Sequence, residues 1–233
     1  MSHVAALPPR LQEVARHVPR GVAVADVGTD HARLPAALVA DGWVPSAIGV
    51  DARAGPLNGA AQTLARLGVT DVALRLGDGL QPIGADEVRT VVLAGLGGAK
   101  IIALLDAWPW LSSLGRVVLQ PNTQWPAVRA WVAARRWQLD AETMITCRGH
   151  AYLTLAVDPS VETDHAWADD PDALLLGPRL MHARPAAWRQ WVAAEYERLR
   201  IARRRAEAAG ATDLAALQET LDRLAPHRTP AER

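Results

Sequence analysis

The chain has 233 residues, no formal net charge at pH 7, 50% hydrophobic residues and 21% charged residues, which fits one globular domain with a small appendage. Its single cysteine, Cys147, excludes an internal disulfide, and we expect a cytoplasmic protein because that compartment keeps thiols reduced. No stretch approaches the ~18 apolar residues of a transmembrane helix, so we expect no membrane association.

Segments with strand-like and helix-like patterns alternate along the first two thirds of the chain. In chain order we expect a helix at 11–19, a strand at 21–28, a helix at 32–42, a strand at 46–51, a helix at 55–68, strands at 72–79 and 88–98, a helix at 99–111, a strand at 115–122, a helix at 124–137, and strands at 138–147 and 151–158. This alternation predicts a parallel sheet with right-handed crossovers and helices on both faces.

The last two expected strands are joined only by Arg-Gly-His, residues 148–150. A connection this short cannot hold a crossover helix, so these two strands must pair antiparallel. Five parallel strands followed by an antiparallel hairpin are typical of an α/β, class I (Rossmann-like) methyltransferase fold with a seven-stranded sheet. A plain dinucleotide-binding fold would continue with another helix at this point.

We assign residues 1–158 to this domain and the polar, proline-bearing segment 159–172 to a linker. Residues 173–233 form an expected helical domain, because apolar residues recur at helical spacing along two stretches that Gly210 separates. The apolar positions are Trp188, Val192, Tyr196 and Leu199, then Leu214, Leu217, Leu221 and Leu224. The pattern predicts a coiled-coil-like helical hairpin.

Polar residues and glycines gather where the expected parallel strands end, the edge at which open α/β sheets bind ligands. The five ends hold Asp26, Gly28, Thr29, Asp30 and His31; Asp51; Gly77, Asp78 and Gly79; Ala94, Gly95, Gly97 and Gly98; and Gln120, Pro121 and Asn122. Taken singly, each has an ordinary structural explanation, such as a turn glycine, a strand-terminal acid or a helix N-cap. The whole set is hard to explain that way and predicts a ligand site.

The residue types favour S-adenosylmethionine over NAD as that ligand. Asp51 lies about 20 residues after the first glycine turn, where an acid can accept hydrogen bonds from both ribose hydroxyls. Asp26 and Asp30 would repel the pyrophosphate of a dinucleotide, but they suit the sulfonium and ammonium groups of S-adenosylmethionine. Asp78, between two glycines, fits an adenine contact in which its carboxylate accepts from the exocyclic amine.

Four segments, "RLQEVARHVPRGVAVADVGTDHARLP", "GDGLQPI", "LAGLGGAKI" and "VVLQPN", resemble the bacterial tRNA adenine N1-methyltransferases that act at position 22, the TrmK family. The resemblance covers residues 10–157 and continues more loosely into the tail. It implies methyl transfer from S-adenosylmethionine to N1 of adenine 22 in tRNA, by a methyltransferase domain followed by a coiled-coil-like helical domain. We expect a monomer or weak homodimer with no metal site.

The resemblance assigns roles to residues of this sequence. Asp30 would be catalytic, with His31 beside it in the same block. The cofactor site would comprise Asp26, Gly28, Thr29, Asp51, Gly77, Asp78, Gly79, Ala94 and Gly95. The tRNA would contact Arg10, Gly97, Gly98, Asn122, Tyr152, Arg203 and Arg204.

The sequence also departs from the family pattern. The family's Gly-Met-Gly-Gly is Gly-Leu-Gly-Gly here, and its Gly-Lys-x-Tyr-Glu is Gly-His-Ala-Tyr-Leu, which keeps Tyr152 but replaces the acid with Leu153. The tail is arginine-rich, and a solvated helix face explains that run at least as well as RNA contact, given the zero net charge.

Other functions stay open beside the tRNA reading. One is a methyltransferase that acts on a small molecule or a protein and uses the helical tail for oligomerisation. The acidic residue set disfavours an NAD enzyme and a non-catalytic binding module. The "LAGLGG" segment lacks the Asn/Asp-Pro-Pro-Tyr motif of enzymes that methylate exocyclic amines of bases, so an exocyclic-amine target is disfavoured.

Overall fold

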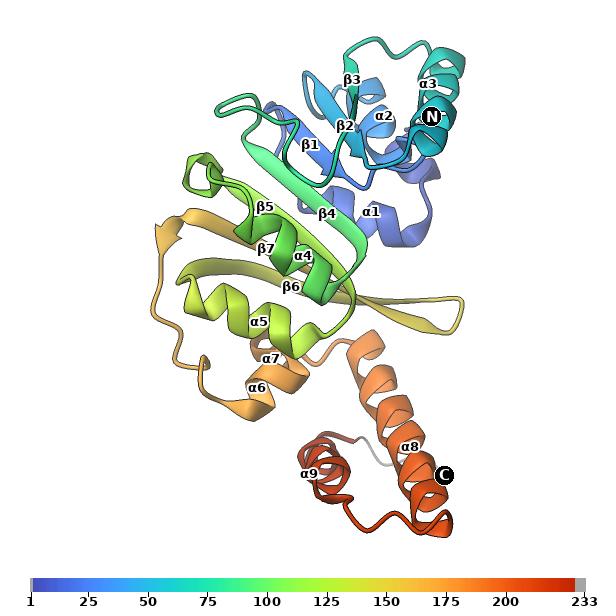
Figure 1. Cartoon of the computed structure of the whole chain (residues 1–233), viewed down its shortest axis with the longest axis vertical. Coiled ribbons are helices and arrows are strands. Elements are labelled where there is room, and N and C mark those ends of the chain that lie inside the picture. The colour runs from blue at the N-terminus through green and yellow to red at the C-terminus, as the bar shows by residue number, and fades with distance from the viewer. Residues whose placement is uncertain (1, 229–233) are drawn as a thin grey trace.

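Seven strands form one sheet in the order β3-β2-β1-β4-β5-β7-β6 in the computed structural model, which describes residues 2–228 (Figure 1). The strands are β1 (Val24–Val27), β2 (Ala47–Asp51), β3 (Val72–Leu76), β4 (Thr90–Gly97), β5 (Arg116–Thr123), β6 (Trp137–Cys147) and β7 (His150–Glu162). The first five pair parallel, and β7 pairs antiparallel with both β5 and β6. The expected parallel sheet with a terminal antiparallel hairpin is confirmed.

The described residues form nine α-helices, and those that precede β6 cover the two faces of the sheet. The nine helices are α1 (Pro9–Arg16), α2 (Arg33–Ala40), α3 (Ala54–Leu67), α4 (Gly98–Asp106), α5 (Trp125–Ala134), α6 (Pro171–Leu176), α7 (Pro178–Ala183), α8 (Ala186–Ala208) and α9 (Ala215–Leu224). Helix α1 begins before the expected residue 11 because Pro9 suits the first turn, where its missing N–H has no helical partner. Helix α4 ends at Asp106, short of the expected residue 111, because Pro109 cannot continue it. Within residues 2–228, no helix is both long and apolar enough to cross a membrane.

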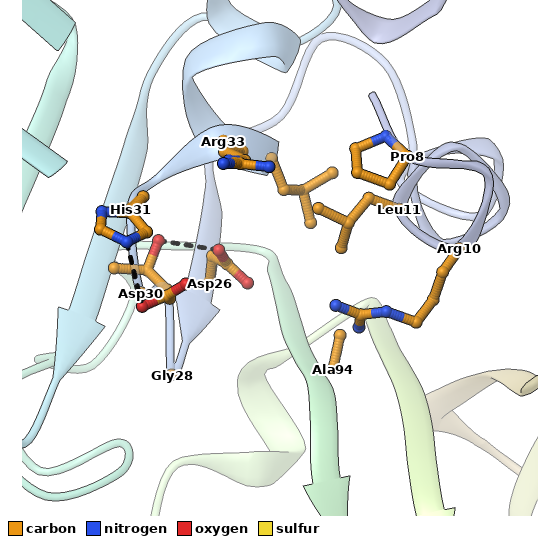
Figure 2. A pocket seen from close by; sticks show the side chains of 11 residues that line it. Pro8, Arg10, Leu11, Asp26, Gly28, Asp30, His31, Arg33 and Ala94 are labelled. Atoms are coloured by element: carbon orange, nitrogen blue, oxygen red, sulfur yellow. Dashed lines mark hydrogen bonds and ion pairs between the residues drawn. The ribbon is translucent and has the colours of Figure 1, made fainter. Parts of the chain in front are cut away.

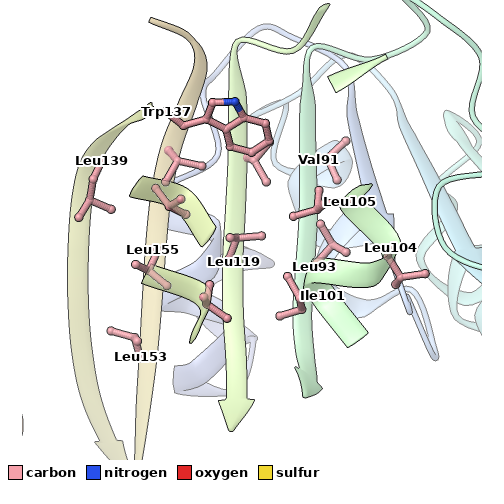
Figure 3. Packing of buried hydrophobic residues seen from close by; sticks show 14 of the residues in the cluster. Val91, Leu93, Ile101, Leu104, Leu105, Leu119, Trp137, Leu139, Leu153 and Leu155 are labelled. Carbon is pink, nitrogen blue, oxygen red and sulfur yellow. The ribbon is translucent and has the colours of Figure 1, made fainter. Parts of the chain in front are cut away.

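Successive residues of the central strands point to opposite faces and build two separate cores. Val91 and Leu93 of β4 pack in the core that holds α4 and α5, whereas Val92 packs with α1 and α2. Figure 3 shows the first core, in which Ile101 and Leu105 of α4 lie against the strands. Because the central strands are covered on both faces, their sequences are continuous apolar runs. The polar carboxyl ends of the strands are the part left for a ligand.

The C-terminal helices pack onto the sheet domain and onto one another. Strand β7 continues to Glu162, into the segment expected as a linker, and α6 and α7 lie against α5 and β6. Helices α8 and α9 run in opposite directions, because Arg203 near the end of α8 donates to Gln218 in α9, while Arg228 lies over the Tyr196 ring. The expected helical hairpin is confirmed. The domain limits expected at residue 1 and residues 229–233 lie outside the described residues.

A buried ion pair fastens α6 and α7 to the sheet domain. The side chains of Arg129 in α5 and Glu142 in β6 have no solvent exposure, and Nε of Arg129 donates to Oε1 of Glu142 at 2.6 Å. Nη1 of Arg129 also donates to the carbonyl oxygens of Leu174 and Leu175 in α6. Oε2 of Glu142 accepts from the backbone N–H of Leu180 in α7. One pair of charges therefore connects four elements.

Replacing Arg129 with Met should destabilise the protein by about 3–5 kcal/mol, because the Glu142 carboxylate would stay buried without a partner. The matched control is Arg135→Met, since Arg135 pairs with Asp106 in a solvent-exposed position, where such pairs contribute about 0–1 kcal/mol. Urea unfolding would measure both losses. Equal losses in the two variants would contradict the role given to the buried pair.

Candidate functional site

Three hollows adjoin one another at the carboxyl ends of the parallel strands. The central hollow has a volume of about 400 Å³, within the ~300–1,000 Å³ range typical of ligand pockets. Most of the residues expected to bind a cofactor lie around it, namely Gly28, Asp51, Gly77, Asp78, Gly79, Ala94 and Gly95. They come from the ends of β1, β2, β3 and β4, so the sheet topology brings four distant segments to one cavity.

Two further hollows share a wall with the central one. The small hollow, about 220 Å³, contains Asp26, Thr29 and His31 in its lining (Figure 2). The side hollow, about 450 Å³, contains Asn122 and Tyr152 in its lining. Arg10 of α1 lines all three hollows. A ligand in any hollow would therefore lie within reach of the same guanidinium group.

The loop after β1 adopts a left-handed backbone. Asp30 and Ala32 have φ values of +53° and +51°, and such conformations cost residues with a Cβ roughly 1–3 kcal/mol each. The backbone N–H of Asp30 donates to Oδ2 of Asp51 at 3.3 Å, which ties the loop to the end of β2. The Asp30 side chain is 65% exposed and lines both the central and the small hollow. The strained turn thus presents a carboxylate where the two hollows meet.

The Asp51 carboxylate has a fixed orientation at the end of β2. Besides the bond from Asp30, its Oδ1 accepts from the backbone N–H of Arg53 at 3.0 Å. The residue is only 6% exposed, yet it lines the central hollow. Because two backbone donors hold the two oxygens, the remaining lone pairs are directed before any ligand arrives.

His31 lies beside Asp30, with its Nε2 3.8 Å from Oδ1 of that aspartate (Figure 2). Its ring packs against Gly59 of α3, where an added Cβ would lie 2.4 Å from Nδ1. Any side chain at position 59 would displace the ring. Gly59 therefore belongs to the support of the site, although its sequence position in a helix gave no sign of this.

Asp26 is a buried acid beneath the loop. It is 6% exposed, and Oγ1 of Thr29 donates to its Oδ2 at 2.8 Å. Burial raises the pKa of Asp26 to about 6, with a smaller push from the charge of Asp51, while the bond from Thr29 and the charge of Arg10 act against the rise. The structure places Thr29 as a partner of Asp26 in the small hollow and not in the central hollow.

Lys100 and Asp78 form an ion pair in the wall of the central hollow. Nζ of Lys100 in α4 lies 3.0 Å from Oδ1 of Asp78, and both side chains are about half exposed. The neighbouring Gly79 approaches α4 so closely that an added Cβ would lie 2.3 Å from Cδ2 of Leu104. This glycine therefore lets the turn after β3 close against α4, and the pair with Lys100 holds one oxygen of Asp78.

A chain of hydrogen bonds joins Arg10 to Asn122 in the wall of the side hollow. Nη1 of Arg10 donates to Oε1 of Gln120 at 2.8 Å, and Nε2 of Gln120 donates to Oδ1 of Asn122 at 3.1 Å. Nδ2 of Asn122 then donates to the carbonyl of Gly95 at 2.7 Å. Strand β4 bulges at Gly95, whose φ is +78°, and an added Cβ would lie 3.1 Å from Nη1 of Arg10. The bulge thus admits Arg10 to the site.

Some residues expected at the substrate lie outside the three hollows. Gly97 and Gly98 line none of the three hollows; a Cβ at Gly98 would lie 2.7 Å from the carbonyl oxygen of Thr123, so this glycine permits close backbone packing. Arg203 and Arg204 lie in α8, away from the hollows. Arg203 pairs with Glu207 at 2.8 Å, whereas Arg204 is exposed and forms no ion pair with any residue of the range 2–228.

Besides Gly59, sequence analysis missed Lys100, which the structure brings to the central hollow. Lys100 is the only lysine in the sequence. Its isolation among many arginines could have drawn attention to it, but composition does not tell where a residue lies in the fold. Gln120 was expected among the polar strand ends and lies within β5, but only the fold reveals that it bridges Arg10 and Asn122. No local pattern could have paired residues so far apart in the chain.

The central and small hollows contain carboxylates that can face a cationic ligand, beside the basic groups of Arg10, Arg53 and Lys100. Asp51 and Asp78 line the central hollow, Asp30 lies where it meets the small hollow, and Asp26 lies below. Carboxylates favour sulfonium and ammonium groups and disfavour phosphates. Because the side hollow shares Gly95 with the central hollow, a group on a ligand in one can meet a second ligand in the other. The arrangement fits group transfer between two bound molecules.

Comparisons with known proteins agree with this geometry. A methyltransferase domain family model matches residues 7–155. The Bacillus subtilis tRNA (adenine(22)-N(1))-methyltransferase is 34% identical over 151 residues, which are 64% of this chain and 63% of that protein. The crystal structure of the B. subtilis M1A22 tRNA methyltransferase TrmK superposes with a TM-score of 0.83 at 28% identity over 96% of this chain and 99% of that one. Streptococcus pneumoniae Sp1610 in complex with S-adenosyl-L-methionine gives 0.85 at 27% identity over 96% and 100%.

The pKa of Asp26 predicts an unusual pH dependence of stability. Because the folded-state pKa is about 6, above the unfolded value of 3.8, the stability that Asp26 contributes is fully present below pH ~4 and is lost as pH rises through ~6. Asp26→Asn removes this loss, so the variant should exceed the wild type by up to about 3 kcal/mol at pH 7.5, and the gap should close towards pH 4.

Urea unfolding of both proteins from pH 4 to pH 8 would measure this gap. Glu87, whose pKa a hydrogen bond from Arg75 lowers to about 2, stays ionised over this range in both proteins and so does not affect the comparison. Parallel stability curves for the two proteins would show that folding does not raise the pKa of Asp26.

Proposed function

Because the chain belongs to the methyltransferase-domain family, we propose that it transfers a methyl group from S-adenosylmethionine to N1 of adenine 22 in tRNA. One observation carries the proposal: the central hollow, lined by three aspartates, adjoins the side hollow, and Arg10 and Gly95 line both. A cofactor in the first and a base in the second would share that boundary.

The central hollow fits S-adenosylmethionine by its shape and its donor set. Asp51 would accept from the ribose hydroxyls with the lone pairs that its two backbone donors leave free. Asp78 would accept from the adenine amine with the oxygen that Lys100 does not hold. Asp26, in the adjoining small hollow, would face the ammonium group, and that cation would favour the ionised acid.

The cofactor supplies an electrophilic methyl group on a sulfonium cation, which becomes a neutral thioether as the methyl leaves. Adenine N1 carries an in-plane lone pair, so the protein needs to position the base more than activate it. The alkylated ring becomes a cation. Asp30 is exposed where the central and small hollows meet and does not line the side hollow. It would act on the alkylated base across the central hollow, stabilising the positive charge and then accepting a proton from the exocyclic amine.

The side hollow would hold the target base. Asn122 is fixed there by its bonds to Gln120 and Gly95, which leave one N–H and one acceptor lone pair for the base. Tyr152 offers an aromatic face, with the guanidinium of Arg10 6.0 Å from its ring centroid. N1 lies on the Watson–Crick edge, so the target adenine must be unpaired when it enters.

The tail also fits a second candidate function of the protein. Several of its arginines are occupied within the helix, since Arg198 pairs with Glu195 and Arg203 pairs with Glu207. This pairing favours a structural role for part of the arginine run. A methyltransferase that acts on a small molecule or a protein, with α8 and α9 used for oligomerisation, would have such a tail.

The assay for the proposed function uses purified protein, labelled S-adenosylmethionine and unmodified tRNA, followed by digestion to nucleosides. We expect label in 1-methyladenosine, and none when adenine 22 is replaced by guanine in the tRNA. The guanine-22 tRNA is the matched control, because it keeps the remaining sequence. Transfer to a protein or small molecule in place of tRNA would establish the second candidate.

Asp30→Asn should reduce turnover by ~10²-fold or more while changing the affinity for S-adenosylmethionine little, since the charge acts on the reacting base. Asparagine tolerates the left-handed backbone at this position, so the fold is retained. Asp86→Asn is the matched control, because Asp86 also has a positive φ, of 61°, in the loop ahead of β4. A collapse of cofactor affinity would place Asp30 in the cofactor site and remove it from catalysis.

A further inference from the structure

A fourth hollow continues from the side hollow towards the helical tail. It has a volume of about 350 Å³ and lies between the β5–α5 connection and α8. We call it the tail groove and define it by Asn122, Trp125, Pro126, Trp191, Glu195 and Arg198. Asn122 lines both this groove and the side hollow. A polymer with one unit in the side hollow could therefore continue past Asn122 into the tail groove.

The groove presents two indole rings in fixed positions. The rings of Trp125 and Trp191 pack with their centroids 5.2 Å apart and their planes tilted by 47°. Nε1 of Trp125 donates to the carbonyl of Pro121 at 2.9 Å, which fixes that ring. Both tryptophans are only partly buried, so aromatic surface remains open to the groove. Such surface suits a planar ring, and base–aromatic stacking contributes ~1–3 kcal/mol per base.

The charges at the rim also suit a nucleotide. Glu195 would repel a phosphate, but Arg198 holds both of its oxygens, with Nε and Nη2 donating at 2.7 and 2.6 Å. Nη1 of Arg198 is not used in this pair, and the side chain is 64% exposed. A guanidinium with a free N–H can still donate to a phosphate oxygen while it keeps its carboxylate partner.

Building on the proposed function, we propose that the tail groove is a second nucleotide subsite. An unpaired base next to the target adenine stacks on Trp191, and Arg198 contacts the phosphate beside it. Taking the target adenine out of its helix unstacks its neighbour, and the groove gives that neighbour a new partner. The subsite also explains why α8 is held against the sheet domain: its first half forms one wall of the groove.

The first test removes the aromatic face and keeps the apolar packing. Trp191→Leu should weaken tRNA binding ~5- to 150-fold, which corresponds to ~1–3 kcal/mol of stacking, and should leave the affinity for S-adenosylmethionine unchanged. Trp191→Phe, which keeps a ring, should recover most of the loss. Trp110→Leu is the control, because Trp110 is 46% exposed and precedes the amino end of β5, the edge of the sheet opposite the site.

Filter binding with unmodified tRNA, together with thermal unfolding, would measure these effects. Equal tRNA affinities for Trp191→Leu and Trp110→Leu would overturn the subsite. So would a Trp191→Leu protein that changes its oligomeric state but keeps its tRNA affinity, since the groove would then hold a second copy of the chain. Failure of the wild type to methylate tRNA at all would count against the proposed function, independently of these variants.

The second test does not depend on the core packing of Trp191. Arg198→Gln should reduce by about one the slope of log affinity for tRNA against log salt concentration, because one phosphate contact is lost. Arg200→Gln is matched to it: Arg200 forms the same i, i+3 pair with Glu197, two residues further along α8, but does not line the groove. Equal changes of the salt slope in the two variants would show that the arginines of the tail attract tRNA without a specific site. That result would overturn the proposed contact between Arg198 and a phosphate.

Discussion

The ion pair between Arg129 and Glu142 satisfies backbone groups as well as its own two charges, because it takes up carbonyls of α6 and an N–H of α7. Gly177 separates these helices with a φ of +94°, and a Cβ there would lie 2.7 Å from the Glu142 oxygens. Only glycine permits so close a turn. Since α8 begins after Arg184 and Pro185, the pair also sets the position of α8 beside the β5–α5 connection. An interaction outside the hollows thus shapes the surface next to them.

The part of the site that could be predicted consists of residues at or just beyond the carboxyl ends of strands. Asp51, Asp78 and Gly95 belong to this class, and sheet topology alone brings them together. The resemblance of four short segments to the TrmK family is confirmed by the curated B. subtilis relative and by the solved structures. Side-chain reach is different: Arg10 meets Gln120 across 110 residues of sequence. Local patterns carry no information on such a contact.

The failures of sequence analysis have physical causes. Gly97 and Gly98 were assigned to the substrate through the family resemblance, but a glycine at a strand end can also admit another backbone, as Gly98 does against Thr123. A sequence does not distinguish these two uses. Helices α6 and α7 are too short to show helical periodicity, and buried polar contacts position them. The strands were predicted well because their apolar runs are long and bounded by turn residues.

The insertion of β7 between β5 and β6 has a consequence for how the protein is made. A ribosome delivers the chain from its N-terminus, and β5 is complete at Thr123, well before β7 ends at Glu162. During that interval one edge of β5 has no partner, although Val117, Val118 and Leu119 are fully buried in the finished protein. Open apolar edges invite pairing with other chains. The nascent protein is therefore most exposed to aggregation just before its final strand emerges.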